Sequence, residues 1–220
     1  MYKKKIRNKN VPKTKPFDEY PAEYEQWFID NRFAFQSELA ALQKAMPVKG
    51  NCTEIGVGSG IFASSLGIKD GVEPSYLMRE KAKERLINAI NGIAEKLPYP
   101  DLSYEHVLMV TTLCFVDDVL QAFNEVFRIL KKNGSFIIGF VDKNSPVGKI
   151  YLENKDKSVF YRDAVFYSTE EVYNFLWKTG FKIKTTLQTV FGMLDTIKEV
   201  QVPEKGYGKG SFIVIKAIKP

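Results

Sequence analysis

Three glycines at alternate positions follow a short apolar run and precede a helical pattern. They lie in the stretch Thr53-Glu54-Ile55-Gly56-Val57-Gly58-Ser59-Gly60. Glycine lets the backbone turn tightly between a strand and a helix, and it lets a ligand approach without a β-carbon in the way. The same residues satisfy a dinucleotide-binding pattern through Gly58, Gly60 and Ala63. The spacing therefore predicts an α/β fold with a nucleotide-type ligand, and it does not choose that ligand.

From residue 50 onward, short apolar runs alternate with helical periodicity, which is typical of a largely parallel sheet with helices between its strands. We expect strands near 51–55, 69–73, 89–92, 105–111 and 134–141. We expect helices near 59–66, 75–88, 117–131 and 169–179. Residues 181–191 and 210–217 are rich in β-forming residues and predict an antiparallel pair. The fold class is α/β: a mostly parallel sheet flanked by helices, with a C-terminal antiparallel strand pair and N-terminal cap helices.

Several element ends carry their own signals. In the N-terminal helical region, Asp30 and Asn31 predict a break between two helices. The helix near 117–131 has Asp117 or Asp118 to cap its start, and Asn133-Gly134 is expected to end it. The last helix opens with the capping-box pair Ser168 and Glu171.

Two carboxylates flank the glycine turn in sequence. Glu54 stands two residues before the first glycine, and Glu73 follows 19 residues later at the end of the second expected strand. A carboxylate at the second position can accept hydrogen bonds from both hydroxyls of a ribose. An anion at Glu54 would repel a pyrophosphate but tolerate the sulfonium and ammonium charges of S-adenosylmethionine. The pair favours S-adenosylmethionine over NAD.

Further motifs follow in a fixed order: Val72-Glu73-Pro74-Ser75, then Gly92-Ile93-Ala94-Glu95-Lys96-Leu97-Pro98-Tyr99, then Leu130-Lys131-Lys132-Asn133-Gly134. In this order they resemble class I S-adenosylmethionine-dependent methyltransferases of the small-molecule, "methyltransferase type 11"-like kind. The resemblance is ordered over 50–141 and weaker over 160–218. It implies a Rossmann-like fold and in-line methyl transfer from S-adenosylmethionine to an unidentified, small-molecule acceptor, with S-adenosylhomocysteine as product and no metal.

The resemblance also implies roles around the methionine and ribose. Gly56, Gly58 and Gly60 would pass beneath these portions of the cofactor. Glu54 would hold the amino group directly or through water, and Glu73 would hold the ribose hydroxyls.

The adenine site is implied to consist of Pro74 and Ser75 beside the ring, Ala94 with its backbone amide on the ring, and Glu95 facing the exocyclic amine. Thr111 and Thr112, at the exit of the fourth strand, would lie along the methionine.

Tyr24 and Trp27 resemble the aromatic pair of a cap helix over the cofactor, or they are ordinary core aromatics. The single histidine, His106, falls at the start of the fourth strand, away from the expected site, so no general base is assigned. The acceptor pocket is expected to be built by the cap helices and residues 142–167, which contain Tyr151, Phe160, Tyr161 and Phe166. These aromatics line an apolar pocket or pack against the sheet, and the sequence does not choose between the two.

Positive charge is concentrated at the N-terminus. Residues 1–16 hold seven of the 32 lysines and arginines and no acidic residue, which leaves 25 cations against 26 anions in the rest of the chain. A nucleic-acid surface needs cations on the folded body. We therefore expect no nucleic-acid partner beyond weak contact by this arm.

The expected organisation is a flexible basic arm over 1–16 and a single methyltransferase domain over 17–220. The domain is expected to comprise cap helices over 17–47, a cofactor-binding core over 50–141, a substrate-side insertion over 142–167, and a terminal helix and strand pair over 168–220. The chain has no apolar run long enough to cross a bilayer and no secretory signal, and Cys52 and Cys114 form no metal or disulfide pattern. We expect a cytoplasmic protein with no membrane partner.

Two alternatives stay open. An NAD-dependent oxidoreductase could use Gly58, Gly60 and Ala63, but it would lack a proton donor near the crevice and leave Glu54 unexplained. A non-catalytic S-adenosylmethionine-binding protein would carry the same motifs, because these motifs report cofactor binding and not turnover.

Overall fold

The computed structural model describes residues 12–220 and contains one eight-stranded sheet in the order β3-β2-β1-β4-β5-β8-β6-β7. The strands are β1 Cys52–Ile55, β2 Asp70–Val72, β3 Asn88–Ile90, β4 Tyr104–Val110, β5 Leu130–Val141, β6 Lys182–Thr189, β7 Glu204–Lys205 and β8 Phe212–Ile218. Strands β1 to β5 pair in parallel, and β8 pairs antiparallel with both β5 and β6. The predicted fold class is confirmed.

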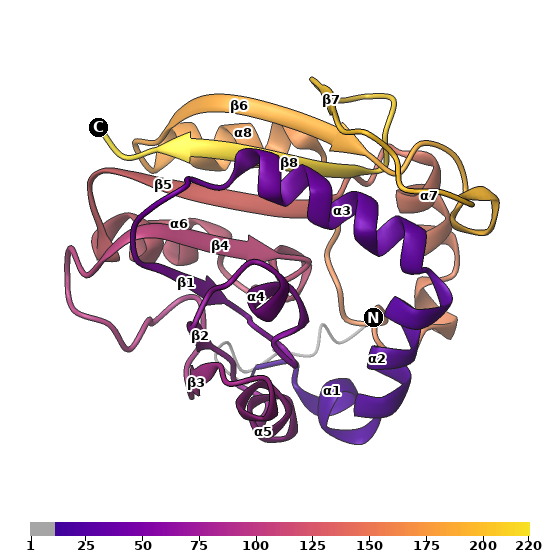
Figure 1. Cartoon of the computed structure of the whole chain (residues 1–220), viewed down its shortest axis with the longest axis horizontal. Helices are drawn as coiled ribbons and strands as arrows, with labels where there is room; N and C mark the ends of the chain where they lie inside the picture. Colours follow the sequence, from indigo (N-terminus) through magenta and orange to yellow (C-terminus); the bar gives the residue numbers. More distant parts are fainter. Residues whose placement is uncertain (1–11) are drawn as a thin grey trace, which may run out of the picture.

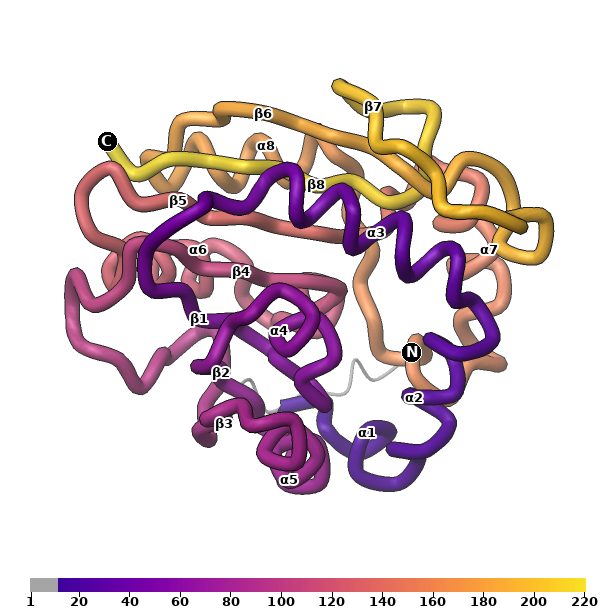
Figure 2. The backbone as a smooth tube through the Cα atoms, viewed as in Figure 1, coloured from indigo at the N-terminus to yellow at the C-terminus, as the bar shows by residue number. Residues whose placement is uncertain are grey.

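Helices cover both faces of this sheet. They are α1 Lys15–Glu19, α2 Pro21–Asp30, α3 Arg32–Ala45, α4 Ile61–Ser65, α5 Tyr76–Glu84, α6 Val119–Ile129, α7 Pro146–Glu153 and α8 Thr169–Lys178. Figure 1 shows α3 and α4 in front of the sheet and α6 and α8 behind it. The chain can be followed in Figure 2 from α1 and α2 into α3, which crosses the front face. No helix in residues 12–220 combines the length and apolar character needed to cross a membrane.

Each face of the sheet has its own apolar core. Phe123 of α6 and Phe136 of β5 belong to the core behind the sheet. Leu42 of α3, Phe62 of α4 and Phe212 of β8 belong to the core in front of it. The strands contribute to both cores in alternation, which is why their sequences read as almost continuous apolar runs.

The start of α6 is confirmed, but its predicted end is wrong. Asp118 caps the start by accepting a hydrogen bond from the Gln121 amide. The helix ends at Ile129, four residues before Asn133-Gly134, and β5 begins at once with Leu130. Leu130 is fully buried and pairs with Tyr104 of β4, so burial and sheet pairing override the local signal.

The other element signals have mixed outcomes. The break between α2 and α3 falls at Asn31, and the Ser168–Glu171 capping box forms at the start of α8, both as predicted. Helix α5 ends at Glu84, short of residue 88. Helix α7 lies in the segment 142–167, where no helix was predicted.

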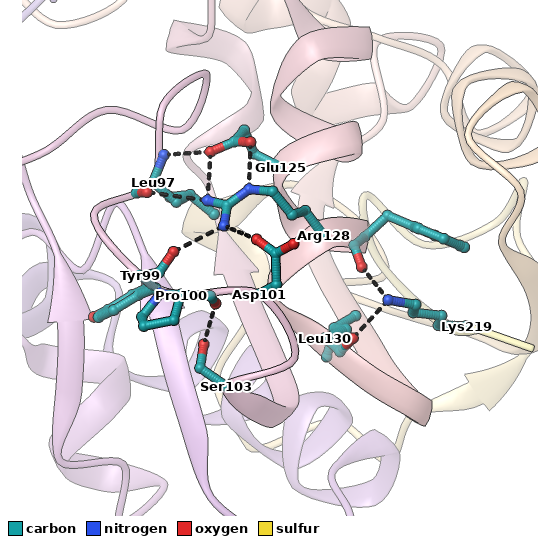
Figure 3. Close-up of polar contacts among 10 residues, drawn as sticks. Leu97, Tyr99, Pro100, Asp101, Ser103, Glu125, Arg128, Leu130 and Lys219 are labelled. Carbon is teal, nitrogen blue, oxygen red and sulfur yellow. Dashed lines mark hydrogen bonds and ion pairs between the residues drawn. The ribbon is translucent and has the colours of Figure 1, made fainter.

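Arg128 of α6 connects this helix to the loop between β3 and β4 by hydrogen bonds. Its guanidinium donates to the Tyr99 carbonyl (2.9 Å), to Asp101 Oδ1 (2.7 Å) and to both carboxylate oxygens of Glu125. Glu125 in turn accepts a hydrogen bond from the Leu97 amide at 2.8 Å. Figure 3 shows this network, with Lys219 nearby on the Leu130 carbonyl. The network holds the segment that contains Ala94 and Glu95.

We predict that Arg128→Met lowers the free energy of unfolding by about 1–3 kcal/mol, because it removes charge-assisted hydrogen bonds from partly buried acceptors. Arg128→Lys should retain only a small part of the lost stability, since a lysine lacks the planar guanidinium that donates several hydrogen bonds at once. Urea unfolding measures both effects, and amide hydrogen exchange should speed up over residues 95–101. Stability within about 0.5 kcal/mol of the parent for Arg128→Met would contradict this role.

Candidate functional site

A pocket of about 660 Å³ opens at the carboxyl ends of β1, β2 and β4. Parallel strands place their carboxyl ends at one edge, which is where open α/β sheets bind ligands. Of the residues predicted to bind a cofactor, the structure brings nine to this lining: Tyr24, Gly56, Gly58, Glu73, Pro74, Ala94, Glu95, Thr111 and Thr112. Glu54, Gly60, Ser75 and Trp27 do not line it.

Gly56 and Gly58 form the floor of this pocket and both adopt positive φ, 69° and 54°. A β-carbon on Gly56 would collide with the side chain of Thr112, and one on Gly58 would lie 3.2 Å from the Tyr24 hydroxyl. Positive φ and close approach both require glycine here. The floor of the pocket is therefore backbone at these two positions, with Thr112 and Tyr24 packed against it.

Gly60 and Glu54 support the floor from behind. Gly60 has a φ of 79°, and a β-carbon there would lie 3.2 Å from the Ala82 backbone, so this glycine allows α4 to pack close to α5. Glu54 is 1% exposed, and its Oε2 is buried with no hydrogen-bond partner among the described residues. Burial raises the pKa of Glu54 well above its ordinary value.

Glu73 lines the pocket directly after β2. Its Oε2 accepts a hydrogen bond from the Gly58 amide (2.9 Å) and its Oε1 accepts one from the Ser75 amide (2.8 Å). Burial raises the pKa of Glu73 to about 7, against the opposing effect of these two amides. Ser75 is fully buried and caps α5, and its hydroxyl donates to Asp18 of α1. Ser75 thus positions Glu73 from outside the pocket.

The predicted adenine end consists of Pro74, Ala94 and Glu95. One oxygen of Glu95 accepts hydrogen bonds from the backbone amides of Asp117 (2.8 Å) and Asp118 (3.2 Å). Glu95 therefore ties its own loop to the start of α6. Asp117 and Asp118 also line the pocket, although the sequence suggested only a helix cap for them.

Thr111 and Thr112 lie where β4 leaves the sheet. Thr112 donates its hydroxyl to the carbonyls of Gly56 and Val110. Thr111 has a φ of 50°, an unusual conformation for a β-branched residue, and its amide is held by the Gly139 carbonyl at 2.8 Å. Such strain persists where the surrounding structure enforces it, and it is frequent at functional sites.

The N-terminal segment crosses this pocket, which the sequence did not predict. Of the predicted arm, residues 1–11 lie outside the described part of the chain. Lys13 is 9% exposed, forms an ion pair with Asp117 at 2.9 Å and donates to the Phe115 carbonyl at 3.1 Å. Phe17 of α1 packs edge-on against Phe115 with ring centroids 5.1 Å apart.

A second cavity of about 150 Å³ adjoins the first, and Phe17, Tyr24, Thr111 and Phe115 line both. Trp27 lines only this second cavity, whereas Tyr24, with which it was paired in the prediction, lines both. Ten aromatic side chains line the second cavity: Phe17, Tyr24, Trp27, Phe28, Phe62, Phe115, Tyr151, Phe160, Tyr161 and Phe212. Of the aromatics expected from residues 142–167, Tyr151, Phe160 and Tyr161 line this cavity and Phe166 does not.

Glu38 of α3 lines this second cavity and was missed from the sequence, where it reads as one more residue of an amphipathic helix. It is 4% exposed, and its carboxylate has no hydrogen-bond or ion-pair partner in residues 12–220. Burial raises the pKa of Glu38 to about 8. No lysine, arginine or histidine lines the cavity within the described chain.

The remaining chemical candidates lie elsewhere or are inert. His106, near the start of β4, contacts the Lys49 carbonyl and the Ser135 hydroxyl, each at 2.8 Å. It lies at the opposite end of β4 from Thr111, as predicted. Burial raises the pKa of the Cys114 thiol to about 12. Within the described residues, no group of three or more histidine, cysteine, aspartate or glutamate side chains is arranged to hold a metal ion.

Comparisons with known proteins agree with this geometry. The sequence profile of the family described as "Methyltransferase domain" matches residues 53–138. An uncharacterized protein of Methanocaldococcus jannaschii is 42% identical over 203 residues, which cover 92% of this chain and 98% of that protein. A demethylmenaquinone methyltransferase of Listeria welshimeri shares a shorter stretch, 35% identical over 71 residues, or 31% of this chain and 29% of that protein.

One solved structure is similar along its whole length. This crystal structure, from Thermotoga maritima, is described as an S-adenosylmethionine-dependent methyltransferase and possible histamine N-methyltransferase. It is 46% identical to this chain, with a TM-score of 0.91, and the match covers 94% of this chain and 99% of that one.

We predict that Glu38→Gln stabilises the ligand-free protein at alkaline pH. Between about pH 4.5 and pH 8 the folded state keeps the Glu38 proton that the unfolded state loses, so this glutamate makes stability fall as pH rises. The gain from Glu38→Gln should therefore grow with pH, by up to about 1 kcal/mol per unit, and level off above about pH 8. Denaturant unfolding of both proteins across this range measures it. Parallel stability curves would contradict the burial of an unpartnered carboxyl.

Proposed function

Because the chain belongs to the S-adenosylmethionine-dependent methyltransferases, we propose that the larger pocket binds S-adenosylmethionine and that the aromatic cavity binds a small-molecule methyl acceptor. The observation that carries this proposal is the junction of the two cavities. Tyr24 and Thr111 line both, so a ligand in each would meet at these residues. The description of the T. maritima relative as a possible histamine N-methyltransferase supports an acceptor of this size.

The residues of the larger pocket fit the cofactor. Gly56 and Gly58 line the pocket with backbone, which a ligand can approach closely. Each oxygen of Glu73 uses one lone pair on a backbone amide and keeps another, so the two can accept hydrogen bonds from two ribose hydroxyls. A volume of about 660 Å³ is in the range of pockets that enclose a cofactor.

Charge around this pocket suits a cationic ligand. Glu54 lies behind the glycine floor and outside the pocket lining. Its carboxylate, one oxygen of which has no hydrogen-bond partner among the described residues, would attract the amino group and sulfonium of the cofactor electrostatically, either directly or through a bridging water. Thr111 and Thr112 would run along the methionine portion. Pro74, the Ala94 amide and Glu95 would border the adenine.

Methyl transfer requires orientation more than side-chain chemistry. S-adenosylmethionine supplies a methyl group that is already activated by the positive sulfur. The chain contributes a rigid floor, an aromatic wall that excludes water, and a fixed approach direction past Thr111 and Tyr24. Such positioning can account for roughly 7–11 kcal/mol of barrier reduction. The proposal therefore needs no general base for a nucleophilic acceptor.

The NAD-dependent alternative gains no support from the relatives. Gly60, which it requires at the ligand, lies outside the pocket lining and allows α4 to pack close to α5, and Glu54 would lie near a pyrophosphate. A protein that binds the cofactor without turnover is distinguished only by assaying acceptor-dependent formation of S-adenosylhomocysteine.

We expect S-adenosylhomocysteine at about 100 times its dissociation constant to stabilise the protein by roughly 2.7 kcal/mol through mass action. For a chain of this size the melting temperature should rise by roughly 5–10 °C. NAD at the same concentration should leave it unchanged. Stabilisation by NAD, and by neither S-adenosylmethionine nor S-adenosylhomocysteine, would refute the cofactor assignment.

Replacing Glu73 by alanine should raise the dissociation constant of S-adenosylhomocysteine at least about tenfold, since it removes two hydrogen bonds to a charged acceptor. Calorimetric titration measures the constant, and circular dichroism checks that the variant is folded. His106→Gln, at the other end of β4, is the control and should leave affinity and methyl transfer within a few fold. Unchanged affinity in folded Glu73→Ala protein would mean that this carboxylate does not hold the ribose.

A further inference from the structure

Among residues 12–220, Glu38 is the one charged side chain that the aromatic cavity encloses. Glu23 also lines this cavity, but it is exposed at the rim. The other polar groups among the described lining residues are the hydroxyls of Thr111, Ser211 and the tyrosines and the indole N–H of Trp27. A cavity otherwise built from aromatic rings and aliphatic groups thus contains an isolated carboxyl group.

The size of the cavity restricts its occupant. An apolar protein cavity of about 150 Å³ accommodates a single benzene ring, and this cavity has about 150 Å³. Its walls suit a flat apolar body: Tyr151 and Tyr161 stack at 4.8 Å between ring centroids with an interplanar angle of 28°. The occupant is therefore of the size of one ring with a short substituent.

The charge of the cavity restricts the occupant further. A buried carboxylate without a counter-charge costs several kcal/mol, so a function for Glu38 requires a ligand that compensates it. Aromatic faces attract cations through their negative π-surface, and a carboxylate adds direct charge compensation. A neutral acceptor would leave Glu38 uncompensated, and an anion would be repelled by Glu38 and Glu23.

We propose, on the basis of the proposed function, that the acceptor is a ring-sized amine that binds as its ammonium ion, and that Glu38 is the residue that selects it. The ammonium lies against the Glu38 carboxylate within the aromatic walls. The ammonium nitrogen has no lone pair, so the atom that accepts the methyl group belongs to the rest of the molecule, which extends toward Thr111 and the larger pocket. Glu38 acts here as a specificity residue for binding.

The contact between Glu38 and an ammonium ion can be tested by varying the pH, because the tyrosines that face Glu38 do not change charge in the range of the test. Tyr24 of α2, Tyr151 of α7 and Tyr161 act on Glu38 electrostatically, and Glu23 lies at the rim. Burial raises the pKa of Tyr151 to about 12 and also raises the pKa values of Tyr24 and Tyr161 above their ordinary value of 10, so these tyrosines stay neutral around pH 8. Affinity for an ammonium should rise as pH approaches 8, where Glu38 ionises, and fall again once the amine loses its proton.

The test compares benzylamine with benzyl alcohol, which has the same size and no charge. Binding is titrated calorimetrically at pH 8 on protein saturated with S-adenosylhomocysteine. We expect benzylamine to bind at least about tenfold more tightly than benzyl alcohol. Glu38→Gln should reduce this preference to within about threefold, and the rim variant Glu23→Gln should keep it.

The outcomes separate the two proposals. The inference is supported if Glu38→Gln loses the preference for benzylamine while its affinity for S-adenosylhomocysteine is unchanged. Equal or tighter binding of benzyl alcohol to the parent protein, an amine preference that survives in Glu38→Gln, or no binding of either probe up to about 10 mM would overturn it. Failure of the parent protein to bind S-adenosylhomocysteine would overturn the proposed function alone, because the amine preference can be measured without that compound.

Discussion

Three carboxylates are buried around two joined cavities without an ion-pair partner among the described residues, and this constraint governs the energetics of the whole site. Glu38, Glu54 and Glu73 are 4%, 1% and 7% exposed. Burial is the largest influence on each and raises all three pKa values. Desolvated carboxylates without counter-charge are destabilising when ionised. Their retention is explained if the protein binds positively charged ligands in both cavities.

The fold brings these groups together from separate elements. Glu54 is the last residue but one of β1 and Glu73 directly follows β2, while α3 extends along the front face (Figure 1) and places Glu38 in the second cavity. Tyr24 lies between them, since it lines both cavities and its hydroxyl interacts electrostatically with all three carboxylates. Any rearrangement of the cap that moves Tyr24 would therefore affect both ligands.

The sequence predicted the part of this site that depends on local chain geometry. The Gly56 and Gly58 turn and the strand-end position of Glu73 follow from short-range rules, and the structure has them at one pocket. The roles of Gly60 and Ser75 differ from the prediction because tertiary contacts decide them: Gly60 allows two helices to approach, and Ser75 caps a helix. No sequence pattern indicated that Glu38 belongs to the site, because the aromatic rings that enclose it come from α2, α7 and the segment around Tyr161, which are distant in sequence. The end of α6 was missed for a similar reason, because Leu130 is held in the sheet by Tyr104.

The most direct test measures how many protons the protein releases when it binds S-adenosylmethionine. S-adenosylmethionine is titrated calorimetrically into the protein at about pH 6 in buffers of different ionisation enthalpy. At this pH the raised pKa of Glu73, about 7, keeps its carboxyl largely protonated in the free protein, whereas a cationic ligand nearby favours the carboxylate. Burial raises the pKa of Glu54 as well, so a cation there has the same effect. We predict a net release of protons on binding, and the number of protons released per bound ligand should be smaller in Glu73→Gln. Binding with no proton release, or with proton uptake, would contradict it.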